Sequence, residues 1–201
     1  MTFFPSIPDN GHLADVFRTF DKGLEPLLAF HDAVLRGESD LTIGQREMIA
    51  AYVSALNDCA FCYNSHRAYA AAFGIDHTVF DRLVDDLDSA PIDEELKPLL
   101  SYVRKLTRLP YKMTQDDVDA VLNAGWSESA LHDAILVTNL FNFMNRVIFA
   151  HGLPDHEALY RERLEGHLQK SLEDRQKANE TALGSDNYQS FGTALKAEKK
   201  G

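Results

Sequence analysis

Both cysteines of this 201-residue chain lie in one short stretch, where two residues separate Cys59 from Cys62. His66 follows Cys62 by four positions, and Glu47 precedes Cys59 by twelve. Four side chains that can hold, pass or exchange a proton therefore fall within twenty residues. Because the chain has no third cysteine, each thiol has only the other as a disulfide partner within the chain. The fold of this stretch decides whether the four side chains meet.

The sequence of this stretch predicts two helices joined by a bend. Thr42, with Gln45 three positions later, forms a capping-box pattern that starts a helix directly after Thr42. Asn57 and Asp58 then interrupt this helix, because their side chains compete for nearby backbone groups. Asp58 is a suitable N-cap for a second helix over residues 59–73. We therefore expect both cysteines in the first turn of the second helix.

On the second predicted helix, Cys59, Cys62 and His66 share one face, since neighbours in this set are three and four residues apart. The free N–H groups and the dipole at a helix start favour a negative charge, and a thiolate is such a charge. His66 can take the thiol proton, and Glu47 can fold across the bend as a proton acceptor. The residues suggest a dithiol–disulfide couple with a proton relay.

Three other interpretations of the same residues stay open. Cys59, Cys62, His66 and Glu47 all carry donor atoms that bind zinc, although structural zinc sites prefer Cys and His to Glu. The cysteines could instead be inert core residues, because free cysteine is often buried. Glu47, taken alone, could be a solvated helix residue.

The pattern Glu-x11-Cys-x2-Cys-x3-His, placed on a helix–bend–helix, resembles the core of the AhpD-like alkylhydroperoxidase family. That family is part of the carboxymuconolactone decarboxylase-like superfamily. The strong match covers residues 41–74, and the whole chain looks most like the branch called peroxidase-related enzymes. A second segment, residues 134–146, is similar to the Asn-Arg helix of that branch.

The resemblance implies an all-α, AhpD-like helical bundle that forms a homo-oligomer, as a dimer, trimer or hexamer. It implies a peroxidase that uses Cys59 and Cys62 as its redox pair, with His66 and Glu47 as the proton relay. An external thiol or dithiol would reduce the disulfide again, and neither a cofactor nor a bound metal is implied. One position departs from the family, because the best-studied members carry a histidine where this chain has Phe61.

We assign the attack on the peroxide to Cys62, because His66 lies one helical turn away and can activate its thiol. Cys59 would then be the resolving partner, although its position nearer the helix start favours it as the thiolate. Two other functions compete with this antioxidant peroxidase. One is a cofactor-free lyase like carboxymuconolactone decarboxylase, since a fold does not fix a reaction. The other is a metal- or redox-responsive binding protein.

Composition limits the partners that we expect. The chain has 20 basic and 31 acidic residues and a net charge of −11, so we expect no binding to nucleic acid. Its first residues have neither a basic nor an apolar signal segment, which predicts a cytoplasmic protein. In that reducing compartment a cysteine pair is more often catalytic than structural. The polar residues in the longest apolar run argue against a membrane span.

The remaining sequence predicts further helices around this redox core. We expect residues 1–172 to form one all-helical domain and residues 173–201 to form a polar tail that packs partly on a neighbouring subunit. Residues 43–73 and 128–151 resemble two copies of one unit, which suggests an internal duplication. The predicted helices outside the core cover residues 12–21, 25–35, 76–87, 93–109, 115–123, 128–151 and 154–172.

Three asparagines and one arginine interrupt the apolar helix predicted over residues 128–151. We expect them to hydrogen-bond within the core or between subunits, and we expect an acidic partner for the arginine. These residues are Asn139, Asn142, Asn145 and Arg146. The histidines other than His66 match no ligand spacing, and His151 is the one that we consider for the pocket.

Overall fold

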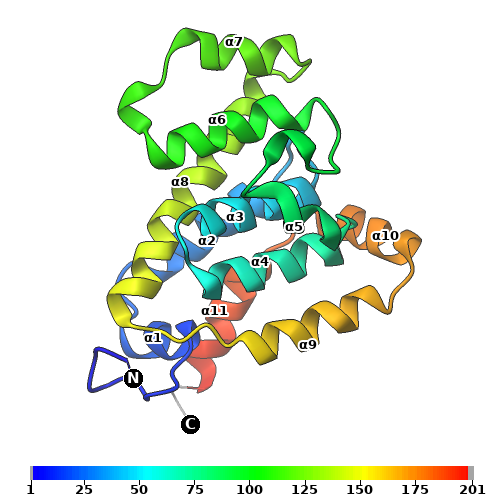
Figure 1. Cartoon of the computed structure of the whole chain (residues 1–201). Coiled ribbons are helices and arrows are strands. Elements are labelled where there is room, and N and C mark those ends of the chain that lie inside the picture. The colour runs from blue at the N-terminus through cyan, green and yellow to red at the C-terminus, as the bar shows by residue number, and fades with distance from the viewer. Residues whose placement is uncertain (1, 199–201) are drawn as a thin grey trace.

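The computed structural model of the chain describes residues 2–198, and within them it is all-helical, without a β-strand (Figure 1). Three short 3-10 helices, at His77–Val79, Leu87–Ser89 and Pro110–Lys112, accompany the α-helices. The α-helices of the described chain are α1 (Leu13–Thr19), α2 (Leu24–Arg36), α3 (Ile43–Leu56), α4 (Ala60–Ala72), α5 (Phe80–Leu83), α6 (Leu96–Arg108), α7 (Gln115–Asn123), α8 (Glu128–His151), α9 (Glu157–Leu168), α10 (Leu172–Ala182) and α11 (Asn187–Glu198). The predicted fold class is confirmed.

Helices α3 and α4 form the predicted helix–bend–helix, with one correction at the bend. The Thr42–Gln45 capping box is present in full at the start of α3. Asp58, however, ends α3 rather than capping α4, because it takes a left-handed conformation with φ of 56°. The Cys59 N–H then donates to the Ser54 carbonyl at 2.8 Å, which closes the end of α3 in a Schellman-like turn. Cys59 itself becomes the N-cap of α4, and Cys62 lies in its first turn.

Helix α3 lies at the centre of the molecule and packs against α4, α8 and α6. Twelve of its 14 residues are buried, so it contacts its neighbours on all sides. Ala50 and Ala51 are completely buried, and such small side chains allow close packing of the surrounding helices. This position fixes any functional side chain of α3 in the protein interior.

Helix α8 is the longest helix and confirms the predicted boundaries. Ser127 caps its start by accepting from the Ala130 N–H, and Gly152 ends it in the left-handed conformation with φ of 64°. Asn139 and Arg146 are exposed. Within residues 2–198 Arg146 has no acidic partner of the kind predicted, and it bonds instead to Asn142. Along residues 2–198, no helix has the length and apolar character needed to cross a membrane.

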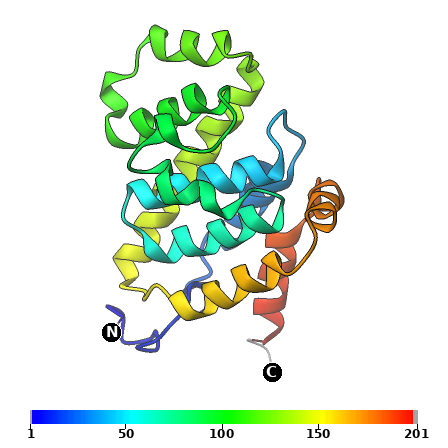
Figure 2. The same ribbon diagram turned by 45° about the vertical axis from the view of Figure 1, so that its right-hand side comes forward.

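The predicted helices elsewhere differ mainly at their ends. Residues 76–87 divide into a 3-10 turn and the short α5, and α6 starts at Leu96 instead of Asp93. Helix α9 covers Glu157–Leu168, shorter than the predicted 154–172, because His156 has a positive φ of 50° and starts the helix late. Figure 2 shows α9 (gold) running beside α4 (teal), and the two helices are in contact.

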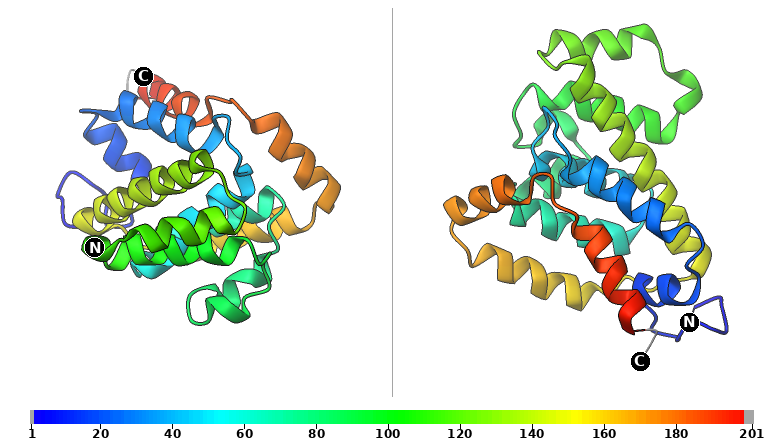
Figure 3. Two further views of the ribbon diagram at one scale, coloured as in Figure 1. Left: turned by 90° about the horizontal axis from the view of Figure 1, so that it is seen from above. Right: turned by 180° about the vertical axis from the view of Figure 1, so that it is seen from behind.

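The C-terminal residues form α10 and α11, and α11 packs on α2 and α1 of the same chain (Figure 3). The carboxylate of Asp32 in α2 accepts hydrogen bonds from the N–H groups of Tyr188 and Gln189, at 2.8 and 2.9 Å. Leu195 is buried against the core, so these tail residues pack on their own chain, and the predicted packing on a neighbouring subunit stays a prediction. The domain boundary at residue 172 and the internal duplication stay predictions.

Candidate active site

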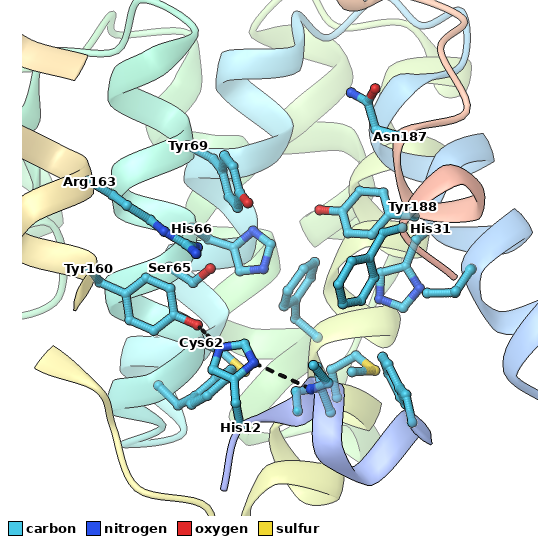
Figure 4. A pocket seen from close by; sticks show the side chains of 18 of the residues that line it. His12, His31, Cys62, Ser65, His66, Tyr69, Tyr160, Arg163, Asn187 and Tyr188 are labelled. Carbon is cyan, nitrogen blue, oxygen red and sulfur yellow. Dashed lines mark hydrogen bonds between the residues drawn. The ribbon is translucent and has the colours of Figure 1, made fainter. Parts of the chain in front are cut away.

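A cavity of about 440 Å³ lies between α4, α9, α11 and the helices at the N-terminal end of the chain (Figure 4). Its walls come from segments far apart in sequence, since α11 lies beside α2 and α9 lies beside α4. Of the four predicted site residues, Cys62 and His66 line the cavity, whereas Cys59 and Glu47 lie behind it. The other lining residues are His12, Leu13, Ala14, Phe17, Leu28, His31, Arg36, Phe61, Ser65, Tyr69, Phe73, Phe141, Met144, Tyr160, Arg163, Asn187, Tyr188 and Phe191.

The two cysteines are free thiols in contact with each other, and their environments differ. Hydrogen bonding from the Cys62 thiol lowers the pKa of Cys59, against the opposing effect of burial. The same hydrogen bond, together with burial, raises the pKa of Cys62 well above its ordinary value. The reduced pair therefore favours a thiolate on Cys59 that accepts a hydrogen bond from the Cys62 thiol.

Asn145 of α8 links this thiol pair to a buried polar network. Its Nδ2 donates to Ser54 Oγ at 3.0 Å, and its Oδ1 accepts from Asn57 Nδ2 at 2.9 Å. These bonds orient the amide so that its N–H groups face Ser54 and the cysteines, and Asn145 lowers the pKa of both thiols. Asn145 thus forms the expected core hydrogen bonds and also contacts the redox pair.

Glu47 lies completely buried between Arg36 and His66. Its Oε1 is 2.6 Å from Nη1 of Arg36, and its Oε2 is 2.5 Å from Nδ1 of His66. Burial alone would raise the pKa of Glu47, but the charges of Arg36 and His66 and their hydrogen bonds lower it to about 2. The solvated interpretation of Glu47 is therefore wrong.

A carboxylate with so low a pKa is a weak base, which changes the role that we predicted for Glu47. As an acceptor only, it receives a hydrogen bond from the Nδ1–H of His66, and this leaves Nε2 as the ring nitrogen that faces away from Glu47. The His66 ring also meets Phe141 edge-on, with 4.3 Å between ring centroids. Glu47 and Phe141 thus hold the orientation of His66, and a proton can be exchanged at Nε2.

Phe61, at the position where the best-studied relatives carry a histidine, is buried beside a histidine from elsewhere in the chain. Its ring centroid lies 5.0 Å from that of His12 and 5.5 Å from that of Tyr160. Nδ1 of His12 accepts from the Ala14 N–H, so Nε2 carries the proton and donates to the Tyr160 hydroxyl at 2.9 Å. A His–Tyr pair therefore stands at this side of the cavity (Figure 4).

The expectation for the other histidines is wrong at two positions. His12 and His31 line the cavity, although neither has a spacing relative to the cysteines that indicates it. His151, by contrast, stacks on Phe4 at 4.7 Å and its Nδ1 donates to the Val147 carbonyl. Within residues 2–198, no three His, Cys, Asp or Glu side chains are grouped so that they could hold a metal ion.

Residues outside the predicted motif complete the site, and their sequence signals are weak. In α2, the buried Arg36 follows the buried Asp32 by four residues, so both lie on the same helix face. Charged residues on a buried helix face indicate a functional or structural role. Tyr160 and Arg163 are three residues apart on α9 and share a face. Their contact with α4 is long-range, and no local pattern reports it.

The fold and this site define a class of protein: an all-helical chain whose CxxC pair places one thiol, that of Cys62, in the wall of a cavity. Residues 22–83 match the carboxymuconolactone decarboxylase family, and these residues include the helix–bend–helix. A Bacillus subtilis (strain 168) protein named as uncharacterized protein YdfG is 27% identical over 115 residues, which cover 57% of this chain and 78% of that protein. The match over residues 22–83 and the solved structures described next support the predicted resemblance to the AhpD-like and carboxymuconolactone decarboxylase-like superfamily.

Two solved structures share the fold. An uncharacterized peroxidase-related protein from Silicibacter sp. TM1040 is 27% identical, with a TM-score of 0.65 over 71% of this chain and 74% of that one. A protein from Ralstonia eutropha JMP134, described as an alkylhydroperoxidase AhpD core and an uncharacterized peroxidase-related protein, is 23% identical. Its TM-score is 0.67, over 72% of this chain and 76% of that one. The predicted resemblance and the AhpD core fold are thus confirmed.

Proposed function

We propose that this protein is a thiol-dependent peroxidase that reduces hydroperoxides through a Cys59–Cys62 dithiol–disulfide couple. The observation that carries the proposal is the arrangement of the pair: Cys62 lines the cavity beside His66, and Cys59 contacts it from the buried side. A substrate in the cavity could reach Cys62, and Cys59 is placed to resolve the product. An external thiol or dithiol would then restore the pair.

Access and acidity favour different cysteines for the first attack. The lower pKa favours Cys59, whereas contact with the cavity favours Cys62. We assign the attack to Cys62, because a thiolate that cannot touch the peroxide cannot react with it. The two thiols share one proton, and its movement from Cys62 to Cys59 gives the reactive thiolate in the accessible position.

The chemistry balances with one peroxide and two electrons from the protein. The Cys62 thiolate attacks one peroxide oxygen, the O–O bond breaks, and Cys62 becomes a sulfenic acid while the other oxygen leaves as an alcohol. His66 Nε2, oriented by Glu47, is placed to take the proton that the thiol pair loses when it forms its thiolate and to pass it to the departing oxygen. Cys59 then attacks the Cys62 sulfur, which forms the disulfide and releases water. A dithiol donor reduces the disulfide by thiol exchange and is itself oxidised.

The comparisons support this proposal at the level of the superfamily. The relative from Silicibacter is described as peroxidase-related, and the Ralstonia relative shares the fold. A reducing compartment such as the cytoplasm would keep the pair reduced between turnovers. As in the expectation from the sequence, we propose a homo-oligomer that works without a cofactor.

Peroxide consumption with dithiothreitol as the electron donor tests the proposal. Cys62→Ser should abolish turnover. Cys59→Ser should stop at the first step, so that a sulfenic acid on Cys62 can be trapped with dimedone. Trapping only on Cys59, in the Cys62→Ser protein, would reverse the assignment of the attacking cysteine. Wild-type protein that consumes no peroxide would refute the peroxidase function.

The matched family name supports one other enzyme function, a cofactor-free carboxymuconolactone decarboxylase-like lyase. Such an activity needs a base such as His66 but not the thiols. It would therefore persist in the Cys59→Ser and Cys62→Ser proteins, whereas peroxidase activity would not. A redox-responsive binding protein would form the disulfide without turnover in the presence of a donor.

A further inference from the structure

The lining of the cavity differs in charge from the chain as a whole. The chain has 31 acidic and 20 basic residues, yet the described residues that line the cavity include no Asp or Glu. They do include five side chains that carry or can accept a positive charge: His12, His31, Arg36, His66 and Arg163. An acidic protein that keeps its carboxylates out of one cavity favours an anionic group there.

Four of these five side chains are already neutral or engaged. Burial is the main cause that lowers the pKa of His12 and of His31 to about 4, so both are neutral at pH 7. Arg36 is paired with the Glu47 carboxylate, and His66 donates to the same carboxylate. These contacts leave Arg163 as the cation that can receive a ligand.

Arg163 extends from α9 toward Ser65 and His66 (Figure 4). Because it lines the cavity and is also exposed to solvent, it lies at the cavity mouth. Its guanidinium carbon lies 5.4 Å from the centroid of the Tyr160 ring, which limits its orientations. None of the ion pairs within residues 2–198 includes Arg163. The planar fork of a guanidinium matches a carboxylate with two parallel hydrogen bonds.

The rest of the cavity suits an apolar body. At about 440 Å³ it is in the range of cavities that hold small organic ligands. Its walls are mainly aliphatic and aromatic, and they come from α1, α2, α4, α8 and α11. The apolar side chains that argue for this are those of Phe17, Leu28, Phe73, Phe141, Met144 and Phe191.

We propose that the substrate is a hydroperoxide with an apolar body and a carboxylate, and that Arg163 binds this carboxylate at the cavity mouth. This inference rests on the proposed peroxidase function and adds the class of peroxide to it. One unpaired guanidinium suits a single carboxylate. The apolar body would then lie along the aromatic walls, with its peroxide group at Cys62.

A matched pair of substrates tests this proposal: a medium-chain hydroperoxy fatty acid and its methyl ester, each reduced with dithiothreitol, an uncharged donor. Wild-type protein should prefer the acid. Arg163→Gln should lower kcat/KM for the acid by about tenfold to a hundredfold, mainly through KM, because charge-assisted hydrogen bonds are lost. The same substitution should leave kcat/KM for the ester within about twofold, because the ester offers no carboxylate to lose.

Arg161→Gln is the matched control, because Arg161 is an exposed residue of the same helix, pairs with Glu157 and does not line the cavity. This substitution removes the same charge and should leave kcat/KM unchanged for both the acid and the ester. Equal kcat/KM for acid and ester in the wild type, or an equal effect of both substitutions, would refute the role of Arg163 and leave the peroxidase function intact. A wild-type protein that reduces neither substrate would refute the peroxidase function itself.

Discussion

Glu47 and His66, one on each arm of the helix–bend–helix, are joined by a 2.5 Å contact between Oε2 and Nδ1 in the protein interior. On its other side the same carboxylate contacts Arg36 at 2.6 Å. The contact fixes the tautomer and the orientation of the histidine that lies one helical turn from Cys62 in the cavity wall. Glu47 is therefore a positioning residue for His66 and at the same time the counter-charge of a buried arginine.

Glu47→Gln should destabilise the protein by about 3–5 kcal/mol, because it leaves the buried Arg36 charge without its partner. Urea denaturation at pH 7 measures this loss. Glu157→Gln is the control, since this exposed carboxylate has only a 3.7 Å pair with Arg161 and should change stability by less than about 1 kcal/mol. Equal unfolding midpoints for the two variants would contradict a charged Glu47–Arg36 pair.

Stability should fall in two steps as the pH decreases. The pKa of His31 is about 4 in the folded state, against an ordinary value of 6.5. As the pH falls from 6.5 to 4, His31 is protonated only in the unfolded state, and this lowers the stability of the folded state. The pKa of Glu47 is about 2 in the folded state, against 4.5 ordinarily, so its ionised form contributes about 3 kcal/mol to stability at neutral pH. This contribution is lost as the pH falls from 4.5 to 2. His12 acts in the same window as His31.

Urea unfolding of the wild type and of His31→Gln at about pH 7, 5.5, 4.5 and 3 separates these steps. The substitution removes one of the two depressed histidines, so stability should decrease less between pH 6.5 and 4 than it does in the wild type. The decrease below pH 4.5 should remain, because Glu47 is unchanged. A pH dependence identical to the wild type across the upper window would contradict the assignment to a buried neutral His31.

Asn145→Ala should make both thiols less acidic, because it removes an amide that stabilises their thiolate forms. The pH midpoint of alkylation by iodoacetamide should move upward. Stability should also fall by about 1–3 kcal/mol, since Ser54 and Asn57 each lose one buried hydrogen bond. Asn139→Ala, an exposed position on the same helix, should change neither quantity. An unchanged alkylation profile would mean that Asn145 is a structural residue only.

Asp32→Ala should loosen the C-terminal helix, because the carboxylate accepts from two N–H groups in the first turn of α11. Loss of such a cap costs about 1–2 kcal/mol. Limited proteolysis should cleave the segment between α10 and α11 faster than in the wild type. Glu180→Ala, on an exposed position of α10, serves as the control. Unchanged cleavage would contradict the capping role of Asp32.

Local signals in the sequence were sufficient for the all-helical fold and for most helix ends. The capping residues Thr42 and Ser127 act on backbone groups three residues away, so their effect can be predicted from the sequence alone. Asp58 was misassigned because aspartate suits both an N-cap and the left-handed end of a helix. The Schellman-like turn that decides between them depends on how the whole bend packs.

The site was predictable only where it lies within one motif. Cys59, Cys62 and His66 are related by helix geometry, and the structure brings them and Glu47 together. Arg36 and Arg163 come from α2 and α9, and no periodicity relates them to the cysteines. Long-range packing places them, together with the tail residue Tyr188, around the cavity.

The most direct test of the account is the intact mass of the protein after one equivalent of hydroperoxide. The account predicts a loss of two hydrogens, which corresponds to a Cys59–Cys62 disulfide, and reversal by dithiothreitol. Neither Cys59→Ser nor Cys62→Ser should show this loss. Two thiols that stay reduced in the wild type, at peroxide concentrations far above one equivalent, would contradict the proposed couple.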